Sequence, residues 1–237
     1  MIILFLLAAL AGWVVGVAIN HAADLLPERT PLRQWPRCSA CGARRPWPAW
    51  SVLLTYLSGQ TACRQCGQGR AKLTRSLGVE VVTPLLFVFL LGRYGPSWYA
   101  GLVSLYTTIL ILVTVTDLEH RLILNDVMLP AILLAVGFAF VTPDLPWKVA
   151  LLGGAVGFVL VYLAALVARG GLGGGDVTLS AFLGLMLFGV FLGGLVAFLL
   201  LITRRVGLKS MIPYGPFLTI TGWIMLVWGD EIWRYYF

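Results

Sequence analysis

The sequence predicts an all-α polytopic membrane protein with about eight transmembrane helices and one small polar insertion near the N-terminus. Of its 237 residues, 59% are hydrophobic and 11% are charged, and the mean hydropathy is +0.91. Roughly a quarter of the residues in a typical soluble domain are charged, so this composition indicates a chain embedded in a lipid bilayer. The insertion, residues 20–76, differs because it holds most of the basic residues and all four cysteines.

The first transmembrane helix is predicted within residues 1–19. Its apolar run, Ile2–Ile19, has no basic stretch before it and no small-x-small cleavage motif after it. We therefore interpret it as a retained span and not as a removed secretory signal. Residues 20–76 form the predicted cytoplasmic domain, and residues 77–237 form the predicted main transmembrane domain.

The main transmembrane domain contains seven further apolar runs. A membrane-spanning helix needs roughly 20 apolar residues, with a lower limit of about 17, and several of these runs are short. The stretch between Val177 and Ile202 fits one long helix or two short helices joined near Gly189. The runs are Leu77–Leu91, Ser97–Thr116, Val127–Val141, Val149–Ala168, Val177–Phe188, Val190–Ile202 and Tyr214–Trp228.

The distribution of basic residues favours two short helices there, and so eight in total. Loops on the cytoplasmic side of a membrane are enriched in Lys and Arg. With a cytoplasmic insertion, eight helices place every Lys and Arg on that side except Arg93, Lys148 and Arg234. The cytoplasmic loops would be 20–76, 117–126, 169–176 and 203–213. The net charge of +7 then reflects membrane topology, and no nucleic-acid partner is expected.

The four cysteines form two Cys-x-x-Cys pairs, CSAC and CRQC, each followed by glycine. Two such knuckles about twenty residues apart are typical of a zinc ribbon, because the spacing points both thiolates of a pair at one ion. The glycine tolerates the tight turn that brings backbone N–H groups toward sulfur. Four thiolates fill the coordination of Zn²⁺, so the ion would be structural. Two disulfides or four free thiols are the alternatives, and a reducing cytosol disfavours disulfides. The predicted zinc ligands are Cys38, Cys41, Cys63 and Cys66.

Two aspartates lie where apolar runs meet the cytoplasmic boundary. Asp117 ends one run in VTVTDLEHRLILND, and Asp176 follows GGLGGG. Two carboxylates brought close together cannot both ionise cheaply and share one proton, which suits peptide hydrolysis. The glycines before Asp176 would let an extended substrate backbone approach and would allow a positive φ before the helix. The residues alone also fit a helix N-cap at Asp176, a solvated loop at Asp117, or an ion site.

Glu80 is a further carboxylate beside a membrane segment, in the stretch SLGVEVVTP. An ionisable group at such a position is a functional candidate. Its side chain could equally snorkel to the cytoplasmic surface. We therefore predict Glu80 to be a substrate-binding or supporting residue.

In combination, these motifs resemble the type IV prepilin leader peptidase/N-methyltransferase family of membrane aspartic peptidases. GGGD, residues 173–176, matches the family's Gly-x-Gly-Asp motif, with Gly173 and Gly175 supporting a catalytic Asp176. DLEHRLILN matches the other aspartate motif, with Asp117 at the catalytic position. IPYGPFL, GVAINHAADLLP, the cysteine knuckles and Glu80 are also similar to features of the family.

This resemblance implies an enzyme of the bacterial inner membrane, with its zinc domain and active site on the cytoplasmic side. The implied substrates are prepilins or pseudopilins, which have a short basic leader, a glycine and a hydrophobic helix already in the lipid bilayer. Cleavage after the glycine exposes a new N-terminus, which the same enzyme methylates with S-adenosylmethionine. Residues 77–237 would then be a transmembrane aspartic peptidase domain.

Three departures from the family pattern leave both carboxylates in place. Leu124 stands where proline is common, Thr178 stands where lysine is usual, and the first-helix exit lacks the usual Ser-Phe. These changes could shift substrate preference or rate. A non-catalytic membrane scaffold or a transporter, each with a zinc docking module, is the alternative. A transporter would need ionisable groups deep in its spans, and these spans are nearly free of them.

Overall fold

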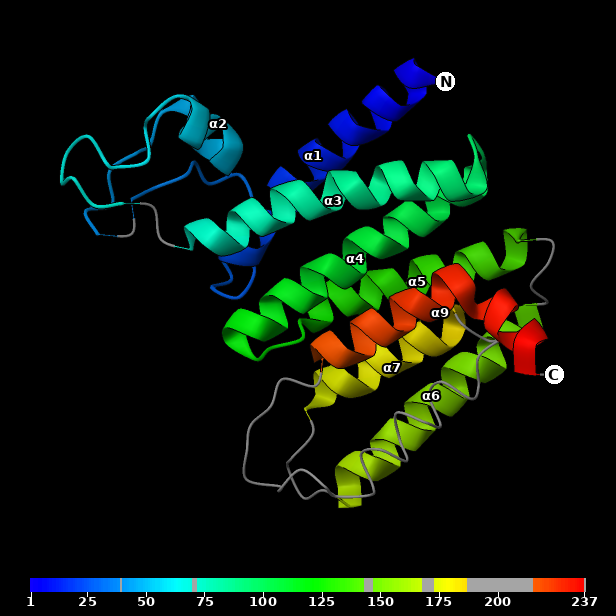
Figure 1. Cartoon of the computed structure of the whole chain (residues 1–237). Helices are drawn as coiled ribbons and strands as arrows, with labels where there is room; N and C mark the ends of the chain where they lie inside the picture. The colour runs from blue at the N-terminus through cyan, green and yellow to red at the C-terminus, as the bar shows by residue number, and fades with distance from the viewer. Residues whose placement is uncertain (39, 70–71, 143–146, 168–172, 187–214, 237) are drawn as a thin grey trace. The chain divides into compact units, whose positions relative to one another are not determined.

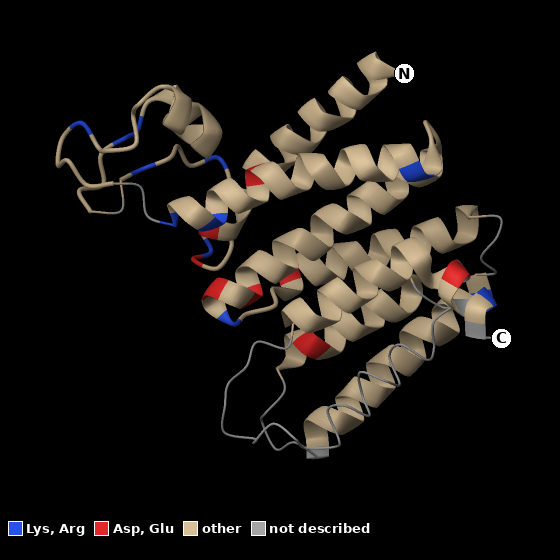
Figure 2. Ribbon diagram, in the orientation of Figure 1, with Lys and Arg blue, Asp and Glu red and all other residues tan. Residues whose placement is uncertain are grey.

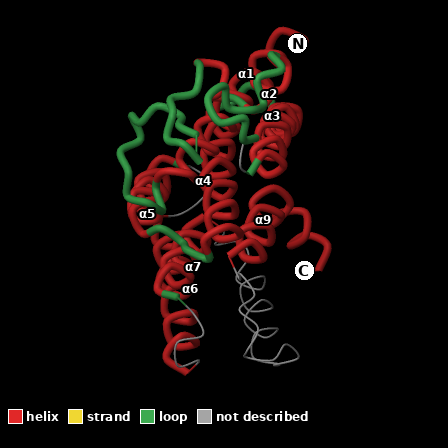
Figure 3. The backbone as a smooth tube through the Cα atoms, turned by 90° about the vertical axis from the view of Figure 1, so that its left-hand side faces the viewer, coloured by secondary structure: helices red, strands yellow, loops and turns green. Residues whose placement is uncertain are grey.

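Helices dominate the architecture of this computed structural model, which describes residues 1–38, 40–69, 72–142, 147–167, 173–186 and 215–236. Within those ranges the β structure is limited to two isolated antiparallel bridges, Arg37–Arg44 and Ala62–Gly69 (Figure 3). The long helices (Figure 1) are α1 (Ile2–Leu25), α3 (Leu73–Tyr94), α4 (Trp98–His120), α5 (Asn125–Val141), α6 (Trp147–Val167), α7 (Gly174–Met186) and α9 (Gly215–Tyr236). The insertion contains a 3-10 helix, η1 (Trp47–Trp50), and a short helix, α2 (Val52–Leu57).

Several of these helices match the length and polarity of membrane spans. Four segments of the described chain are long and apolar enough to cross a membrane: Ile2–Leu25, Leu73–Tyr94, Trp98–His120 and Trp147–Leu166. Shorter apolar helices cover Asn125–Val141, Gly174–Met186 and Gly215–Gly229. The all-helical class and the multi-pass membrane character are therefore confirmed. The predicted helix Val190–Ile202 and the loop 203–213 lie outside the described residues, so the total of eight stays a prediction.

Two helices extend beyond the apolar runs that predicted them. α1 continues past Ile19 to Leu25, and α3 begins at Leu73, ahead of Leu77. A helix satisfies its backbone hydrogen bonds within itself, so the end of an apolar run does not stop it. The extensions carry charged side chains, whereas the spans are nearly free of charge and the basic residues gather in the insertion (Figure 2).

The first compact unit, Met1–Leu112, is built on the pair of α1 and α3, which run side by side (Figure 1). Glycines line the contact between them. A Cβ on Gly12 would lie 2.5 Å from the Cα of Pro84, and a Cβ on Gly16 would lie 3.2 Å from the Cα of Glu80. Bare backbone allows two helices to approach this closely, and the approach brings Glu80 against α1.

The second compact unit, Val113–Phe237, is built around α7, which packs against α6, α5 and α9. The boundary between the two units falls within α4. Small residues again allow the closest contact, here between α6 and α7. The hydroxyl of Ser180 donates a hydrogen bond of 3.1 Å to the carbonyl of Gly157, and Gly184 lies directly against the backbone of Gly153.

We expect the substitution Gly184→Ala to destabilise the second unit. The new methyl carbon would lie 2.7 Å from the carbonyl carbon of Gly153. Because helix backbone cannot move aside as a flexible side chain does, the free energy of unfolding should fall by about 1–3 kcal/mol. Gly137→Ala is the matched control, since a Cβ there meets nothing within 4 Å and alanine favours helix. Unfolding in one detergent measures both variants, and equal stability would contradict the close packing.

Candidate active site and metal centre

Asp117 lies near the C-terminal end of α4 and is almost completely buried, with 6% of its surface exposed. Its Oδ2 accepts a hydrogen bond of 3.0 Å from the backbone N–H of Gly215, the first residue of α9. About one turn earlier on α4, the hydroxyls of Thr114 and Thr219 share a hydrogen bond of 2.7 Å. Hydrogen bonds therefore join α4 to α9 at Asp117 and again about one turn before it on α4.

Asp176 lies in the first turn of α7 and is half-buried. Its Oδ2 accepts a hydrogen bond of 2.9 Å from the backbone N–H of Gly173, and its own N–H donates to the Gly173 carbonyl at 3.1 Å. This is the reciprocal bonding of a residue inside the first turn that reaches back to the N-cap. Asp176 thus stabilises the start of α7 from within the helix and not from the N-cap position.

Asp117 lies near enough to Asp176 for its negative charge to reach the Asp176 carboxylate, although the two residues are far apart in the sequence. In each carboxylate Oδ2 accepts a backbone N–H. Among the residues that the structure describes, no group donates to either Oδ1. As far as the described residues go, one oxygen of each carboxylate is therefore available to a water molecule or a carbonyl group. Such a pair can work as acid and base when one member holds a proton and the other does not.

The loop that follows Asp117 packs on the start of α7. A Cβ on Gly175 would lie 2.6 Å from the carbonyl oxygen of Ile123. The hydroxyl of Thr178 donates a hydrogen bond of 3.0 Å to Oδ1 of Asn125, the first residue of α5. The sequence analysis missed Asn125 and treated Thr178 as a departure from lysine. These contacts fix the first turn of α7 against the start of α5.

The positive φ predicted for the glycines before Asp176 is wrong at residues 173–175. None of these three glycines adopts a positive φ. Gly175 is required because Ile123 occupies the place of a Cβ, and Gly173 contributes its N–H to the carboxylate. The neighbouring glycines at 170–171 lie outside the described residues. Close approach of a substrate backbone to this segment stays a prediction.

Each Cys-x-x-Cys pair folds as the same tight knuckle. In the first knuckle the N–H of Gly42 donates to the carbonyl of Cys38, and in the second the N–H of Gly67 donates to the carbonyl of Cys63, both at 2.9 Å. Both glycines have a φ of +70°, a conformation that side chains disfavour. The turn predicted for the trailing glycines is therefore confirmed.

The four sulfur atoms gather at one point, all within 4.8 Å of one another. Cys38 Sγ lies 3.6 Å from Cys66 Sγ, and Cys41 Sγ lies 3.7 Å from Cys63 Sγ. A disulfide needs roughly 2.05 Å, and all four thiols are free. Tetrahedral zinc with Zn–S bonds of about 2.3 Å places neighbouring sulfur atoms about 3.8 Å apart. Both the donor set and its spacing fit one zinc ion.

Backbone N–H groups favour the thiolate form, which binds metal, at Cys38 and Cys63. The N–H of Cys41 makes the largest contribution in lowering the pKa of Cys38 to about 6, and the N–H of Cys66 does the same in lowering the pKa of Cys63. At Cys66 the N–H of Gln68 lowers the pKa, but desolvation and the other three sulfur atoms together raise it to about 12. Four thiolates repel one another, and a divalent cation would remove that repulsion.

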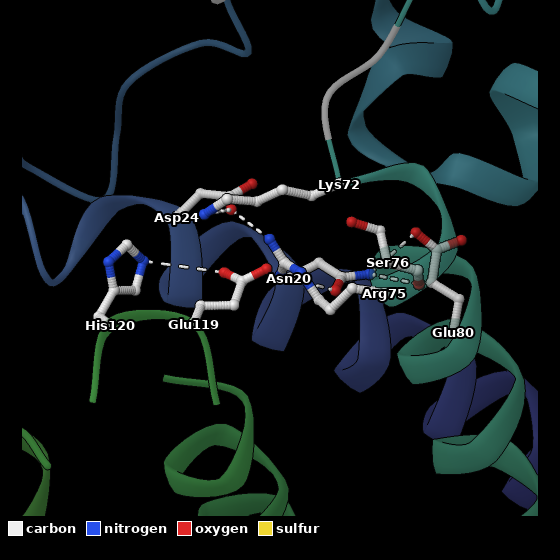
Figure 4. Close-up of polar contacts among 8 residues, drawn as sticks. All are labelled: Asn20, Asp24, Lys72, Arg75, Ser76, Glu80, Glu119 and His120. Atoms are coloured by element: carbon white, nitrogen blue, oxygen red, sulfur yellow. Dashed lines mark hydrogen bonds and ion pairs between the residues drawn. The ribbon is translucent and has the colours of Figure 1, made fainter. Parts of the chain in front are cut away.

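Glu80 lies in α3 within the first unit, with 0% of its surface exposed. Its carboxylate accepts hydrogen bonds from Ser51, the N-cap of α2, and from Asn20 of α1. Figure 4 shows Glu80 beside Asn20. The side chain does not reach the surface, so the snorkelling alternative is wrong. Its hydrogen bonds join α3 to α1 and to the start of α2, and its predicted substrate-binding or supporting role stays a prediction.

The fold and these sites define a multi-pass membrane protein with a four-cysteine module and a pair of carboxylates suited to proton transfer. The chain belongs to the type IV leader peptidase family, which matches it over residues 104–208, a range that includes both aspartates. The resemblance stated on the sequence motifs is therefore confirmed.

Curated relatives extend this similarity over most of the chain. The prepilin leader peptidase/N-methyltransferase of Pseudomonas putida is 30% identical over 266 residues, covering 95% of this chain and 91% of that protein. The protein of the same name from Pseudomonas aeruginosa is 32% identical, covering 84% of this chain and 73% of that protein. The one from Bacillus subtilis is 28% identical, covering 85% of each. No solved structure is significantly similar to this chain.

We expect the purified protein to contain about one zinc ion per chain and the variant Cys66→Ser to lose it, because a hydroxyl is a poor substitute for a thiolate. Affinity should fall as the pH is lowered, since protons compete with the metal for sulfur. Elemental analysis after dialysis against a chelator measures both effects. Arg64→Ser is the control, because it changes an exposed residue of the same knuckle without removing a sulfur atom. Metal-free wild-type protein, or metal retained in Cys66→Ser, would contradict the assignment.

Proposed function

We propose that this chain cleaves the basic leader peptide from type IV prepilins or pseudopilins and then N-methylates the new N-terminal residue. The observation that carries this function is the 30% identity with the Pseudomonas putida prepilin leader peptidase/N-methyltransferase, over 91% of that protein. The similarity covers 95% of this chain, so it is not confined to the residues that match the peptidase family.

The two aspartates are the proposed catalytic residues for cleavage. A water molecule between the open oxygens of Asp117 and Asp176 would give a proton to the ionised carboxylate and attack the scissile carbonyl carbon. The protonated carboxylate would donate to the carbonyl oxygen, and the C–N bond would then break as the leaving nitrogen takes a proton. The proton is shared, so neither role belongs to one aspartate. The support is the effect of the Asp117 charge on Asp176 and the Oδ1 on each carboxylate, which receives no donor from the described residues.

The residues around the pair would hold it in place and admit the substrate. Gly173 supports Asp176 through its N–H, and Gly175 allows Ile123 to pack against the first turn of α7.

The new N-terminus released by cleavage is an amine, and its nitrogen is the nucleophile for methylation. S-adenosylmethionine would supply the methyl group.

The reaction would take place at the cytoplasmic face of the bacterial inner membrane, because the basic leader lies on that side of the substrate's helix. The predicted eight-helix topology agrees with this, since it places the basic loops and both aspartates on one side. The cysteines would hold a structural zinc ion in a zinc-ribbon-like cytoplasmic domain. The functional division would be 1–19 for the first helix, 20–76 for the zinc domain and 77–237 for the peptidase domain.

The alternative functions are not favoured. A non-catalytic scaffold does not fit a chain whose curated relatives are named as peptidases and methyltransferases. A transporter needs ionisable groups deep within its spans. In α6, described over residues 147–167, Lys148 is the single charged side chain. It lies in the first turn, and so at the end of the span.

We expect the wild-type protein to cleave a model prepilin, and Asp117→Asn or Asp176→Asn to lower the cleavage rate by about 10²–10⁴-fold. An amide cannot exchange the shared proton. Asp126→Asn is the matched control, since Asp126 is exposed at the start of α5, and its rate should be unchanged. Mass spectrometry of the product, with and without S-adenosylmethionine, reports cleavage and methylation together. Near-normal cleavage by either first variant would exclude the carboxylate pair.

We also expect Gly215→Ala to slow cleavage while the protein still inserts. The added carbon would lie 2.6 Å from Oδ2 of Asp117, so the carboxylate must move away from the N–H that holds it. Misplacement by about 1 Å costs an enzyme on the order of 10²-fold in rate. Gly101→Ala on α4 is the control, because a Cβ there meets nothing within 4 Å. Equal cleavage rates in the two variants would show that Gly215 does not position Asp117.

A further inference from the structure

Glu80 is a buried carboxylate that the cleavage mechanism does not use. It lies in α3 with 0% exposure, and its two oxygens accept four hydrogen bonds. Oε2 accepts from the hydroxyl of Ser51 at 2.6 Å and from the N–H of Leu53 at 3.0 Å. Oε1 accepts from the N–H of Val52 at 2.7 Å and from Nδ2 of Asn20 at 3.4 Å. With two donors on each oxygen, the carboxylate has little capacity left for a substrate.

Three of these four donors come from the start of α2, and the fourth, Asn20, comes from α1. Ser51 is the N-cap of α2, and Val52 and Leu53 are its first two residues. Ser51 also closes the cap locally, since its Oγ accepts the N–H of Leu54 at 3.2 Å. Glu80 therefore takes the place of a capping carboxylate for a helix that lies elsewhere in the sequence. This bonding attaches α2 to α3.

Asn20 carries the network from Glu80 to α1 and then to the edge of the unit (Figure 4). Its Nδ2 also donates to the carbonyl of Ser76 at 2.9 Å, and its Oδ1 accepts from Arg75 at 3.2 Å. Arg75 in turn pairs with Asp24, near the C-terminal end of α1. Burial makes such a network costly to break, because each partner left alone loses its hydrogen bond without gaining water.

A ring contact holds η1 on α1, and a close helix approach brings α1 against α3 beside Glu80. The rings of His21 and Trp50 lie 4.4 Å apart between their centroids, and Trp50 is the last residue of η1. Gly16 lets α1 approach the backbone of α3 beside Glu80. The cysteine cluster lies in other segments of the insertion, 38–41 and 63–66. The cysteine knuckles and the residues that attach η1 and α2 to α1 and α3 are therefore different parts of the insertion.

We propose that Glu80 is a positioning residue that anchors the cysteine-bearing insertion to the α1–α3 pair and holds it in place for methyl transfer. The proposal rests on the methyl-transfer half of the proposed function. It assigns Glu80 no contact with the substrate and no part in breaking the peptide bond. Glutamine has one acceptor oxygen where glutamate has two, so Glu80→Gln sets an NH₂ group against backbone or hydroxyl donors.

The test compares Glu80→Gln with Glu28→Gln, an exposed carboxylate of the same insertion, in full-length protein in lipid nanodiscs. Hydrogen exchange of peptides covering residues 48–57 should become about 10-fold faster or more in Glu80→Gln, with zinc content unchanged. Methylation of a cleaved prepilin should fall by a similar factor, whereas cleavage should stay within about 2-fold of wild type. Glu28→Gln should match wild type in every readout.

A second pair of variants tests the anchor independently of how well Glu80→Gln folds. Ser51→Ala removes one donor to the carboxylate and should show the same pattern more weakly, and Ser51→Thr, which keeps the hydroxyl, should restore methylation. Unchanged exchange in Glu80→Gln, or equal loss of methylation and cleavage at normal abundance, would overturn the proposal. If the wild-type protein cleaves without methylating, the methyl-transfer half of the proposed function is wrong, and the exchange result separately decides whether Glu80 is the anchor.

Discussion

Each acid of the candidate sites in this protein depends on a helix that begins beside it. A carboxylate withdrawn from water must find its hydrogen-bond donors within the protein, and the first N–H groups of a helix are the backbone donors left free. Asp117 accepts from the first residue of α9, Asp176 from the residue before α7, and Glu80 from the start of α2. The same pairing fixes each helix start relative to the acid that it serves.

The number of donors separates the two kinds of acid. Glu80 has two donors on each oxygen, three of them from the start of α2, and this full set of bonds suits the proposed anchor. Asp117 and Asp176 each accept one backbone N–H from the described residues, which keeps the carboxylate in place and leaves its Oδ1 open. Close packing of glycine serves the pair as well, because Gly215 and Gly175 occupy places where a Cβ would strike Asp117 or Ile123.

The features that the sequence revealed are those whose signal is local. The Cys-x-x-Cys spacing predicted the sulfur cluster, and the apolar runs predicted the helices, although α1 and α3 extend beyond those runs because polar residues continue a helix without cost to its backbone bonds. Hydrogen-bond partners distant in the sequence could not be predicted. Gly215 is separated from Asp117 by 98 positions, and Val52 from Glu80 by 28. The positive φ predicted for Gly175 is wrong for the same reason, because the close contact of Gly175 with Ile123 appears only when the chain is folded.

The central claim is that Asp117 and Asp176 work as one acid–base pair. Cleavage rates of wild type, Asp117→Asn, Asp176→Asn and the double variant, measured on one model prepilin at equal protein abundance, test it most directly. Groups that act as a unit are strongly non-additive, so the account predicts that each single variant falls to nearly the same residual rate as the double variant. A double variant slower than either single one by the product of their separate effects would show that the two carboxylates act independently, and would contradict the account.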